Sequence, residues 1–142
     1  MHTPPHSDAS STGRCPCGRP GALAQCCGPY LSGDVAAPDP ESLMRSRYTA
    51  FALGTAEAIE YLVATHHPDF REDDLREGLR ASIASVDGWE RLEVRFAEVD
   101  GVRGTVEFVA TFRVGRQRRQ LRERSQFVRE GGRWLYTEGA GE

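Results

Sequence analysis

The sequence predicts an α+β fold in which helices pack on an antiparallel sheet, with a small cysteine-rich knuckle in front of them. Two observations carry this prediction. Apolar residues recur at helical spacing between residues 39 and 84, and from residue 88 their period changes to two. All four cysteines lie between residues 15 and 27, which sets that short segment apart from the rest of the chain.

Composition narrows the class of protein. The chain has 142 residues, enough for one domain and a small appendage, and its 39% hydrophobic and 27% charged residues are typical of a globular protein. A net charge of -3 argues against a protein that coats nucleic acid. Residues 1–14 are polar, so we expect a disordered tail and no secretory signal. Without a membrane span we expect a cytoplasmic protein with reduced thiols.

The cysteines form the pattern C-x-C-x8-C-C, with Cys15 and Cys17 as one pair and Cys26 and Cys27 as the other. Adjacent residues have Cα atoms about 3.8 Å apart, whereas a relaxed disulfide needs roughly 4.4–6.8 Å, so the second pair cannot bridge without distortion. A cross-bridge such as Cys15–Cys26 stays open, although the expected compartment disfavours it. Redox use of the thiols is the other alternative.

Two close pairs of thiolates separated by a short loop supply the four sulfur ligands that zinc prefers. Glycines at 18, 21 and 28 allow sharp turns around a small ion, and Arg14 and Arg19 can offset its negative ligand shell. A site with four protein ligands leaves no position for substrate. We therefore predict a structural Zn²⁺ bound by Cys15, Cys17, Cys26 and Cys27.

Several sequence blocks resemble known proteins. CPCGRPGALAQCCGPYLSG is similar to the SEC-C zinc motif, although the last ligand of that motif is commonly His where this chain has Cys27. LMRSRYTAF (43–51), YLVATHHP (61–68), RERSQFV (122–128) and RWLYTEG (133–139) resemble the YchJ-like, or UPF0225, family. The resemblance implies a SEC-C zinc knuckle at 15–33 and an NTF2-like cone, a curved sheet around helices, at 34–139. It implies no settled activity.

The first helix is predicted to run from an N-cap at Asp39, with Pro40 in its first turn, to a stop at Gly54. Its apolar stripe consists of Met44, Tyr48 and Phe51. Before it, residues 28–40 read as a Pro/Gly-rich linker.

Two further helices precede the sheet. The second directs Ile59, Leu62 and Val63 inward and ends before Pro68. The third begins at Asp73 or Asp74. Its apolar positions follow at i, i+4 and i+8, namely Leu75, Leu79 and Ile83.

Four strands follow Asp87-Gly88. The first alternates from Leu92 to Phe96, and Asp100-Gly101 marks a hairpin turn. The remaining strands are predicted at 106–114, at about 120–129 after a turn at 115–118, and at 134–137 after Gly131-Gly132. Trp89, Trp134 and Tyr136 are expected to be core residues.

Polar side chains of the third strand raise the question of a pocket. By parity Glu123 and Ser125 share a face with Leu121 and Phe127, and a buried carboxylate needs a partner, for which Arg45 or Arg47 of the first helix is suited. One interpretation is an internal ion pair that fixes helix against sheet. The other is a ligand or catalytic pocket, whose candidate residues are Arg45, Arg47, Tyr48, His67, Glu123 and Ser125.

Residues 113–124 carry six arginines against a single glutamate: Arg113, Arg116, Arg118, Arg119, Arg122 and Arg124. They suit phosphate groups of RNA or an acidic partner. No aromatic residues interleave with them, as they would in a single-strand binder, so we favour a solvated hairpin and expect no nucleic-acid partner.

Three functions remain. Because no catalytic triad, phosphate loop or open metal site is evident, we favour a zinc-stabilised adaptor that docks a protein partner through its knuckle. The alternative is a small-molecule enzyme of isomerase, dehydratase or hydrolase type that uses the cone. The third is RNA or ribosome association through the arginine hairpin. The catalytic residues, if any, are not assigned.

Overall fold

The computed structural model describes residues 14–141. The expected disordered tail at 1–14 therefore lies outside the described residues except for Arg14, which forms an isolated antiparallel bridge with Ala22. Helices come first and an antiparallel sheet follows, so the predicted α+β order is confirmed.

The helical elements are η1 (Leu23–Gln25), α2 (Gly28–Ser32), α3 (Pro40–Leu53), α4 (Ala56–Ala64), η2 (Pro68–Phe70) and α5 (Leu75–Ala84). In α3 the carboxylate of Asp39 accepts from the backbone N–H of Ser42 at 2.7 Å, and Gly54 ends the helix with a φ of 64°. The prediction of a linker at 28–40 was wrong for its first residues, which form helix α2. Within residues 14–141 no helix is long and apolar enough to cross a membrane.

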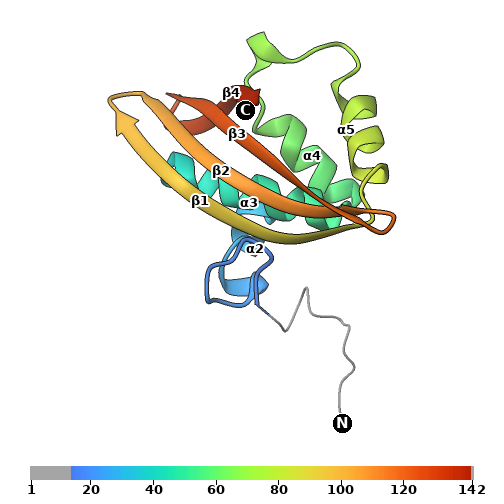
Figure 1. The fold of residues 1–142 in the computed structure, drawn as a ribbon. Coiled ribbons are helices and arrows are strands. Elements are labelled where there is room, and N and C mark those ends of the chain that lie inside the picture. Colours follow the sequence, from blue (N-terminus) through green and yellow to red (C-terminus); the bar gives the residue numbers. More distant parts are fainter. Residues whose placement is uncertain (1–13, 142) are drawn as a thin grey trace.

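The sheet consists of β1 (Gly88–Asp100), β2 (Arg103–Val114), β3 (Gln117–Glu130) and β4 (Arg133–Gly141), in that spatial order and antiparallel throughout. β3 is longer than predicted because its pairing with β2 continues almost to the turn, with Val114 opposite Gln117. β4 is longer because its pairing with β3 continues to Gly141, opposite Glu123. Register shifts in β1 and between Gln126 and Phe127 mark bulges, which increase the bend of a sheet. Figure 1 shows the strands curving around α3 and α4.

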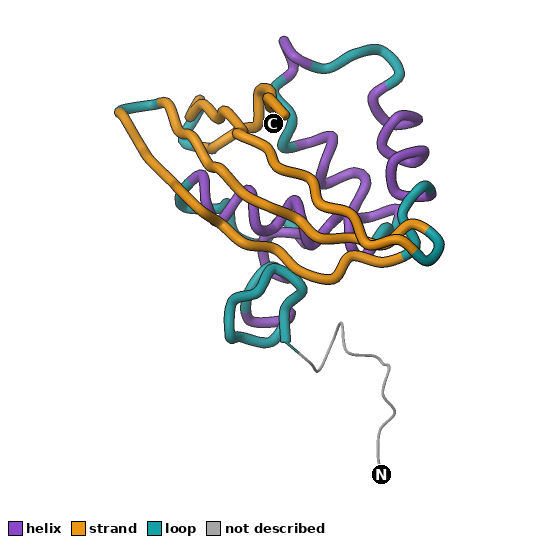
Figure 2. The backbone as a smooth tube through the Cα atoms, in the orientation of Figure 1, coloured by secondary structure: helices purple, strands orange, loops and turns teal. Residues whose placement is uncertain are grey.

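Two apolar clusters lie on the concave side of the sheet, where the helices pack. One joins α3 to the strands and includes Leu43, Val106 and Phe127, all at most 1% exposed. The other joins α3, α4 and α5 around Leu62 and Leu79. The cysteines form a third cluster in the knuckle, which Figure 2 shows to consist of loop and short helical turns without a strand of the sheet. The knuckle therefore depends on its sulfur cluster and on α3 for its shape.

Candidate metal centre and candidate ligand cavity

The four cysteine sulfurs converge on one point. All four Sγ atoms lie within 4.8 Å of one another, and Cys15, Cys17 and Cys27 are buried while Cys26 is half-buried. Cys17 Sγ and Cys26 Sγ are 3.6 Å apart, far longer than a disulfide of about 2.05 Å, and all four thiols are free. The expected clustering is therefore present without a sulfur–sulfur bond.

This arrangement fits a metal ion. In a tetrahedral site with metal–sulfur bonds of about 2.3 Å, neighbouring sulfurs lie about 3.8 Å apart. The distance of 3.6 Å between Cys17 Sγ and Cys26 Sγ is close to that value. The donor set consists of four soft thiols that the fold already holds together. These four residues can hold a metal ion of the kind that favours sulfur ligands.

The thiols influence one another strongly. Hydrogen bonds from Cys17 and Cys27 lower the pKa of the Cys15 thiol, whereas the bonds to Cys15 and Cys17 raise the pKa of Cys27. Burial and the bond to Cys17 raise the pKa of Cys26 to about 12. Crowded thiolates repel one another, so a cation among them favours the fully deprotonated set.

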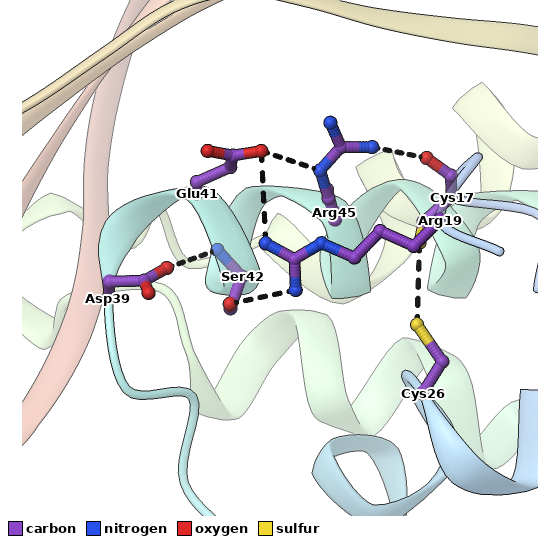
Figure 3. A network of polar contacts seen from close by, with 7 residues as sticks. All are labelled: Cys17, Arg19, Cys26, Asp39, Glu41, Ser42 and Arg45. Atoms are coloured by element: carbon purple, nitrogen blue, oxygen red, sulfur yellow. Dashed lines mark hydrogen bonds and ion pairs between the residues drawn. The ribbon is translucent and has the colours of Figure 1, made fainter. Parts of the chain in front are cut away.

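Polar contacts attach the knuckle to α3 (Figure 3). Arg45 donates from Nη1 to the backbone carbonyl of Cys17 at 2.7 Å and from Nε to Glu41 Oε2 at 2.9 Å. Arg19 donates to Ser42 Oγ at 3.1 Å and lies 3.7 Å from the same Glu41 oxygen. One carboxylate thus joins an arginine of the knuckle to an arginine of the helix.

Thr49 adds a contact with the sulfur cluster itself. Its side chain is completely buried, and its hydroxyl donates to Cys27 Sγ at 3.4 Å while lying 3.6 Å from Cys15 Sγ. Groups that hydrogen-bond to metal ligands orient them and tune their basicity. The sequence analysis missed Thr49. Its spacing could have indicated this role, because Thr49 follows Arg45 by four residues and therefore lies on the same face of α3.

Helix α3 contacts the knuckle with one face and lines the main cavity with another. The residues that contact the knuckle follow a spacing of three and four, namely Ser42, Arg45 and Thr49. The residues that line the main cavity follow the same spacing on another face, namely Met44, Arg47, Tyr48 and Phe51. The helix therefore connects the candidate metal centre to the cavity through its own backbone.

The cavity has a volume of about 430 Å³ and lies between the concave sheet, α3 and α5. Volumes of about 300–1,000 Å³ are usual for small-molecule sites. One end is aromatic, because the Trp89 ring lies 5.6 Å from the Tyr48 ring and 5.3 Å from the Phe112 ring, measured between centroids. Leu75, Leu79 and Val86 complete the apolar wall.

The other end is polar and is organised around Tyr136. The guanidinium carbon of Arg47 lies 4.6 Å from the centroid of its ring, and the His66 ring meets it edge-on at 5.2 Å. Ser125 donates to Glu123 Oε2 at 2.7 Å, and all of these residues line the cavity. Burial, together with the negative charge of Glu123, raises the pKa of Tyr136 to about 12.

Glycine makes room for the carboxylate. A Cβ placed on Gly139 would lie 2.1 Å from Glu123 Oε2, so any side chain there would displace Glu123. Burial, followed by the charge of Arg47, lowers the pKa of His66 to about 4, and burial raises the pKa of Tyr48 to about 12. His66 and Tyr48 are therefore uncharged at neutral pH.

The predicted pocket residues divide into two groups. Arg47, Tyr48, Glu123 and Ser125 line the cavity, whereas Arg45 and His67 do not. Arg45 lies on the knuckle face of α3. His67 ends the segment after α4, where Nδ1 accepts from the Asp69 N–H at 3.0 Å and Nε2 lies 3.0 Å from Glu130. His66, which the sequence analysis left out of the pocket, lines it instead because it bridges to Tyr136 of β4.

The expected internal ion pair is also corrected. Among residues 14–141 no nitrogen of Arg45 or Arg47 lies within 4.0 Å of a Glu123 oxygen. Arg47 instead donates from Nη1 to the Leu62 carbonyl at 2.9 Å and to Thr65 Oγ1 at 2.7 Å. These contacts satisfy one carbonyl and one hydroxyl at the end of α4, where a positive charge is favourable.

The arginine hairpin is partly neutralised by neighbouring strands. Glu90 pairs with Arg113 at 3.0 Å and with Arg118 at 2.7 Å. Arg124 pairs with Glu107, and Arg119 donates to Gln117. These contacts leave a weaker positive field than the sequence alone indicates.

A second hollow of about 560 Å³ lies beside the knuckle. Its walls come from α2 and the segment after it, from α4 and from the start of β4. It exposes apolar side chains such as Val35 beside Glu57, Glu60 and Arg133. Residues 30–33, the end of the knuckle, form part of its wall. A partner that docks on this side of the knuckle would therefore contact the hollow.

Known proteins resemble this chain in both sequence and fold. The sequence matches a protein-family model described as YchJ, middle NTF2-like domain, over residues 39–139. A UPF0225 protein of Chromobacterium violaceum is 45% identical over 129 residues, which are 88% of this chain and 90% of that protein. The solution structure of a SEC-C motif containing protein from Rhodopseudomonas palustris has a TM-score of 0.80 and 39% identity, covering 90% of this chain and 98% of the other. A crystal structure of a SEC-C motif containing protein from Psychrobacter arcticus has a TM-score of 0.76 and 27% identity, with coverages of 91% and 82%. The NTF2-like fold expected from the sequence is thereby confirmed.

Proposed function

This chain belongs to the UPF0225 family, with a cysteine knuckle in front of a YchJ-type NTF2-like domain, and on that basis we propose that it is a zinc-stabilised protein that binds a small molecule in its main cavity. The observation that carries the proposal is the cavity of about 430 Å³, which has an aromatic end and a polar end with a buried arginine. Apolar walls with few convergent polar groups are typical of small-molecule sites.

Zinc is the metal that we assign to the knuckle. Zinc takes four sulfur ligands in a tetrahedron, and the sulfur spacing supports that geometry. All four positions come from the protein, so the assigned role is structural. Zinc bound in this way contributes on the order of 10 kcal/mol to local folding, enough to order a knuckle that has almost no apolar core.

The knuckle in turn supports the cavity helix. Arg45, Thr49 and Ser42 hold the knuckle on one face of α3, and the cavity occupies another. In this proposal zinc fixes the position of α3 and thereby the shape of the cavity. It takes no part in contacts with the ligand.

Metal analysis tests the first half of the proposal. Protein purified under reducing conditions is expected to contain one zinc per chain by plasma mass spectrometry. The Cys17→Ser, Cys26→Ser variant is expected to lose the metal and to unfold at a lower temperature. Unchanged thermal stability after chelation by a strong zinc chelator would remove zinc from the structural role.

Native mass spectrometry tests the second half. The purified protein is expected to retain a small molecule, and Ala110→Phe, which places a ring in the cavity, is expected to lose it. Ala97→Phe is the matched control, because Ala97 is exposed on β1 and does not line the cavity. Equal retention by both variants would place the ligand elsewhere. A change in the mass of the ligand on incubation with protein would assign an enzyme rather than a binding protein.

A docking function is the second candidate, favoured by the hollow beside the knuckle. That hollow combines an apolar floor with charges of both signs, a combination suited to an extended segment of a protein partner. Ala64→Arg would block it, since Ala64 lies on its wall and is exposed. Recovery of the same cross-linked partner by this variant, by Cys17→Ser, Cys26→Ser and by the unchanged protein would remove both the hollow and the knuckle from the function.

A further inference from the structure

Arg47 is a buried cation in an otherwise largely apolar cavity. It is 8% exposed, and no carboxylate oxygen lies within 4.0 Å of its nitrogens among residues 14–141. Burial lowers the pKa of Arg47 to about 10, so the side chain still carries its charge at neutral pH. A buried charge with no counter-ion in contact is costly, and an anion brought to it from outside regains part of that cost.

The guanidinium keeps one edge free for such an anion. Nη1 serves both contacts with α4, to the Leu62 carbonyl and to Thr65 Oγ1. For Nε and Nη2 the described residues offer no hydrogen bond, yet no fully buried side-chain nitrogen in residues 14–141 lacks a partner. These two nitrogens therefore keep access to the open volume beside them, which is the cavity that Arg47 lines.

Glu123 makes no ion-pair contact with Arg47, although its negative charge favours the charged form of the guanidinium. Its Oε2 accepts from Ser125 at 2.7 Å and lies over the backbone of Gly139. The guanidinium of Arg47 lies over the ring of Tyr136 at 4.6 Å, and burial, followed by the negative charge of Glu123, raises the pKa of the same phenol to about 12. The carboxylate is thus held by Ser125 of β3 against Gly139 of β4, while the guanidinium lies over the face of the Tyr136 ring.

We propose that the ligand of this cavity is a monocarboxylate with an aromatic or other apolar body, whose carboxylate pairs with the free Nε and Nη2 edge of Arg47. The proposal rests on the function proposed above and names its ligand class. Nε and Nη2 form a planar pair of donors that matches the two oxygens of a carboxylate. The apolar body then lies among Tyr48, Trp89 and Phe112.

The charges of the cavity favour one negative charge on the ligand. Arg47 and Glu123 are its charged groups, and His66 and Tyr48 are neutral at neutral pH. A cationic head would meet Arg47, and a dianion such as a phosphate ester would bring a second negative charge toward Glu123. A single carboxylate makes the one pair that the free edge of Arg47 offers and leaves the hydrogen bond from Ser125 to Glu123 in place.

Three probes that differ only in the head group test the proposal. Isothermal titration calorimetry would measure naphthylacetate, naphthylacetamide and naphthylethylammonium against the full, zinc-loaded protein at one ionic strength. We expect the carboxylate to bind about ten- to a hundredfold more tightly than the amide, the usual gain for a charge-assisted pair. The ammonium probe is expected to bind most weakly.

Variants of Arg47 and Glu123 test which residue is responsible for a preference for the carboxylate probe. Arg47→Gln is expected to bring the carboxylate and amide affinities to within about twofold. Arg47→Lys keeps the charge without the planar pair of donors, and it replaces the glutamine variant if that variant does not fold. It should lower the preference for carboxylate several-fold without abolishing it. Glu123→Gln, the control at the other charged group, should retain or strengthen the preference.

The outcomes separate this inference from the proposed function. Equal affinities for amide and carboxylate in the unchanged protein, or a preference that survives Arg47→Gln, would overturn the carboxylate assignment while ligand binding in the cavity stands. Absence of binding by all three probes, together with no retained molecule in native mass spectrometry, would overturn both.

Discussion

Replacing Thr49 by valine isolates the link between α3 and the sulfur cluster. Valine has nearly the same shape as threonine, so the substitution exchanges a buried hydroxyl for a methyl group and leaves the packing of α3 almost unchanged. The hydroxyl donates to Cys27 Sγ at 3.4 Å and lies 3.6 Å from Cys15 Sγ. Its removal takes one donor away from ligands that must be thiolates when metal is bound.

The expected loss follows from that one contact. A hydrogen bond to a charged group contributes about 1.5–3 kcal/mol, which corresponds to roughly a tenfold to a hundredfold change in dissociation constant. Residues that support metal ligands from outside typically change metal affinity by about the same factor. We therefore expect Thr49→Val to weaken zinc binding at least tenfold while the protein stays folded.

Competition with a chromogenic zinc chelator at constant pH measures the affinity, and far-ultraviolet circular dichroism checks the fold. Thr49→Ser keeps the hydroxyl and should retain most of the affinity. Thr137→Val is the matched control, because it also removes a buried hydroxyl bond, at 3.0 Å to the Gln126 carbonyl, but on β4. Zinc affinity of a folded Thr49→Val protein within about twofold of the unchanged protein would refute the reasoning.

Three further predictions concern the domain. Gly104→Ala should lower the free energy of unfolding by about 1–3 kcal/mol in urea titrations, because its Cβ would lie 2.3 Å from the proline ring that begins α3; Gly78→Ala, in an open part of α5, should instead stabilise slightly. The pKa of His66 is about 4 in the folded protein against an ordinary 6.5, so the unfolded chain takes up the proton first and stability should fall between pH 7 and 5 by up to about 2 kcal/mol. His66→Phe should show a correspondingly smaller fall in parallel urea titrations, and an identical fall would contradict this. Arg116→Ser, Arg122→Ser protein should elute from an RNA column at the same salt concentration as the unchanged protein, whereas earlier elution would indicate phosphate contacts.

Local signals predicted the elements well. Asp39, Pro40 and Gly54 delimit α3 because caps act over a few residues, and the Asp-Gly and Gly-Gly pairs mark turns for the same reason. The strand period also placed Glu123 and Ser125 on the face that lines the cavity. The linker was misread at α2, since Pro29 also suits the first turn of a helix.

The side-chain partners were not predictable in the same way. Arg45 and Arg47 flank one apolar stripe on opposite sides, and only the packing of the knuckle on one flank and α4 on the other decides which of them reaches the cavity. The choice between His66 and His67 likewise depends on a backbone contact with β4, where the His67 N–H donates to the Tyr136 carbonyl at 2.8 Å. Such contacts join residues far apart in the chain, so spacing within one segment does not encode them.

The two faces of α3 offer a physical reason for the position of the candidate metal centre. A buried arginine that serves a ligand must be held in place although its charge is costly, and Arg47 is fixed by α4 on one side and by its helix on the other. The knuckle contacts Arg45 and Thr49, which precede and follow Arg47 by two residues. Because a helix backbone is regular over such a distance, fixing these two positions also fixes the backbone from which the Arg47 side chain extends. A metal ion bound by the four cysteines would in this way determine the geometry of a cavity that none of the cysteines lines.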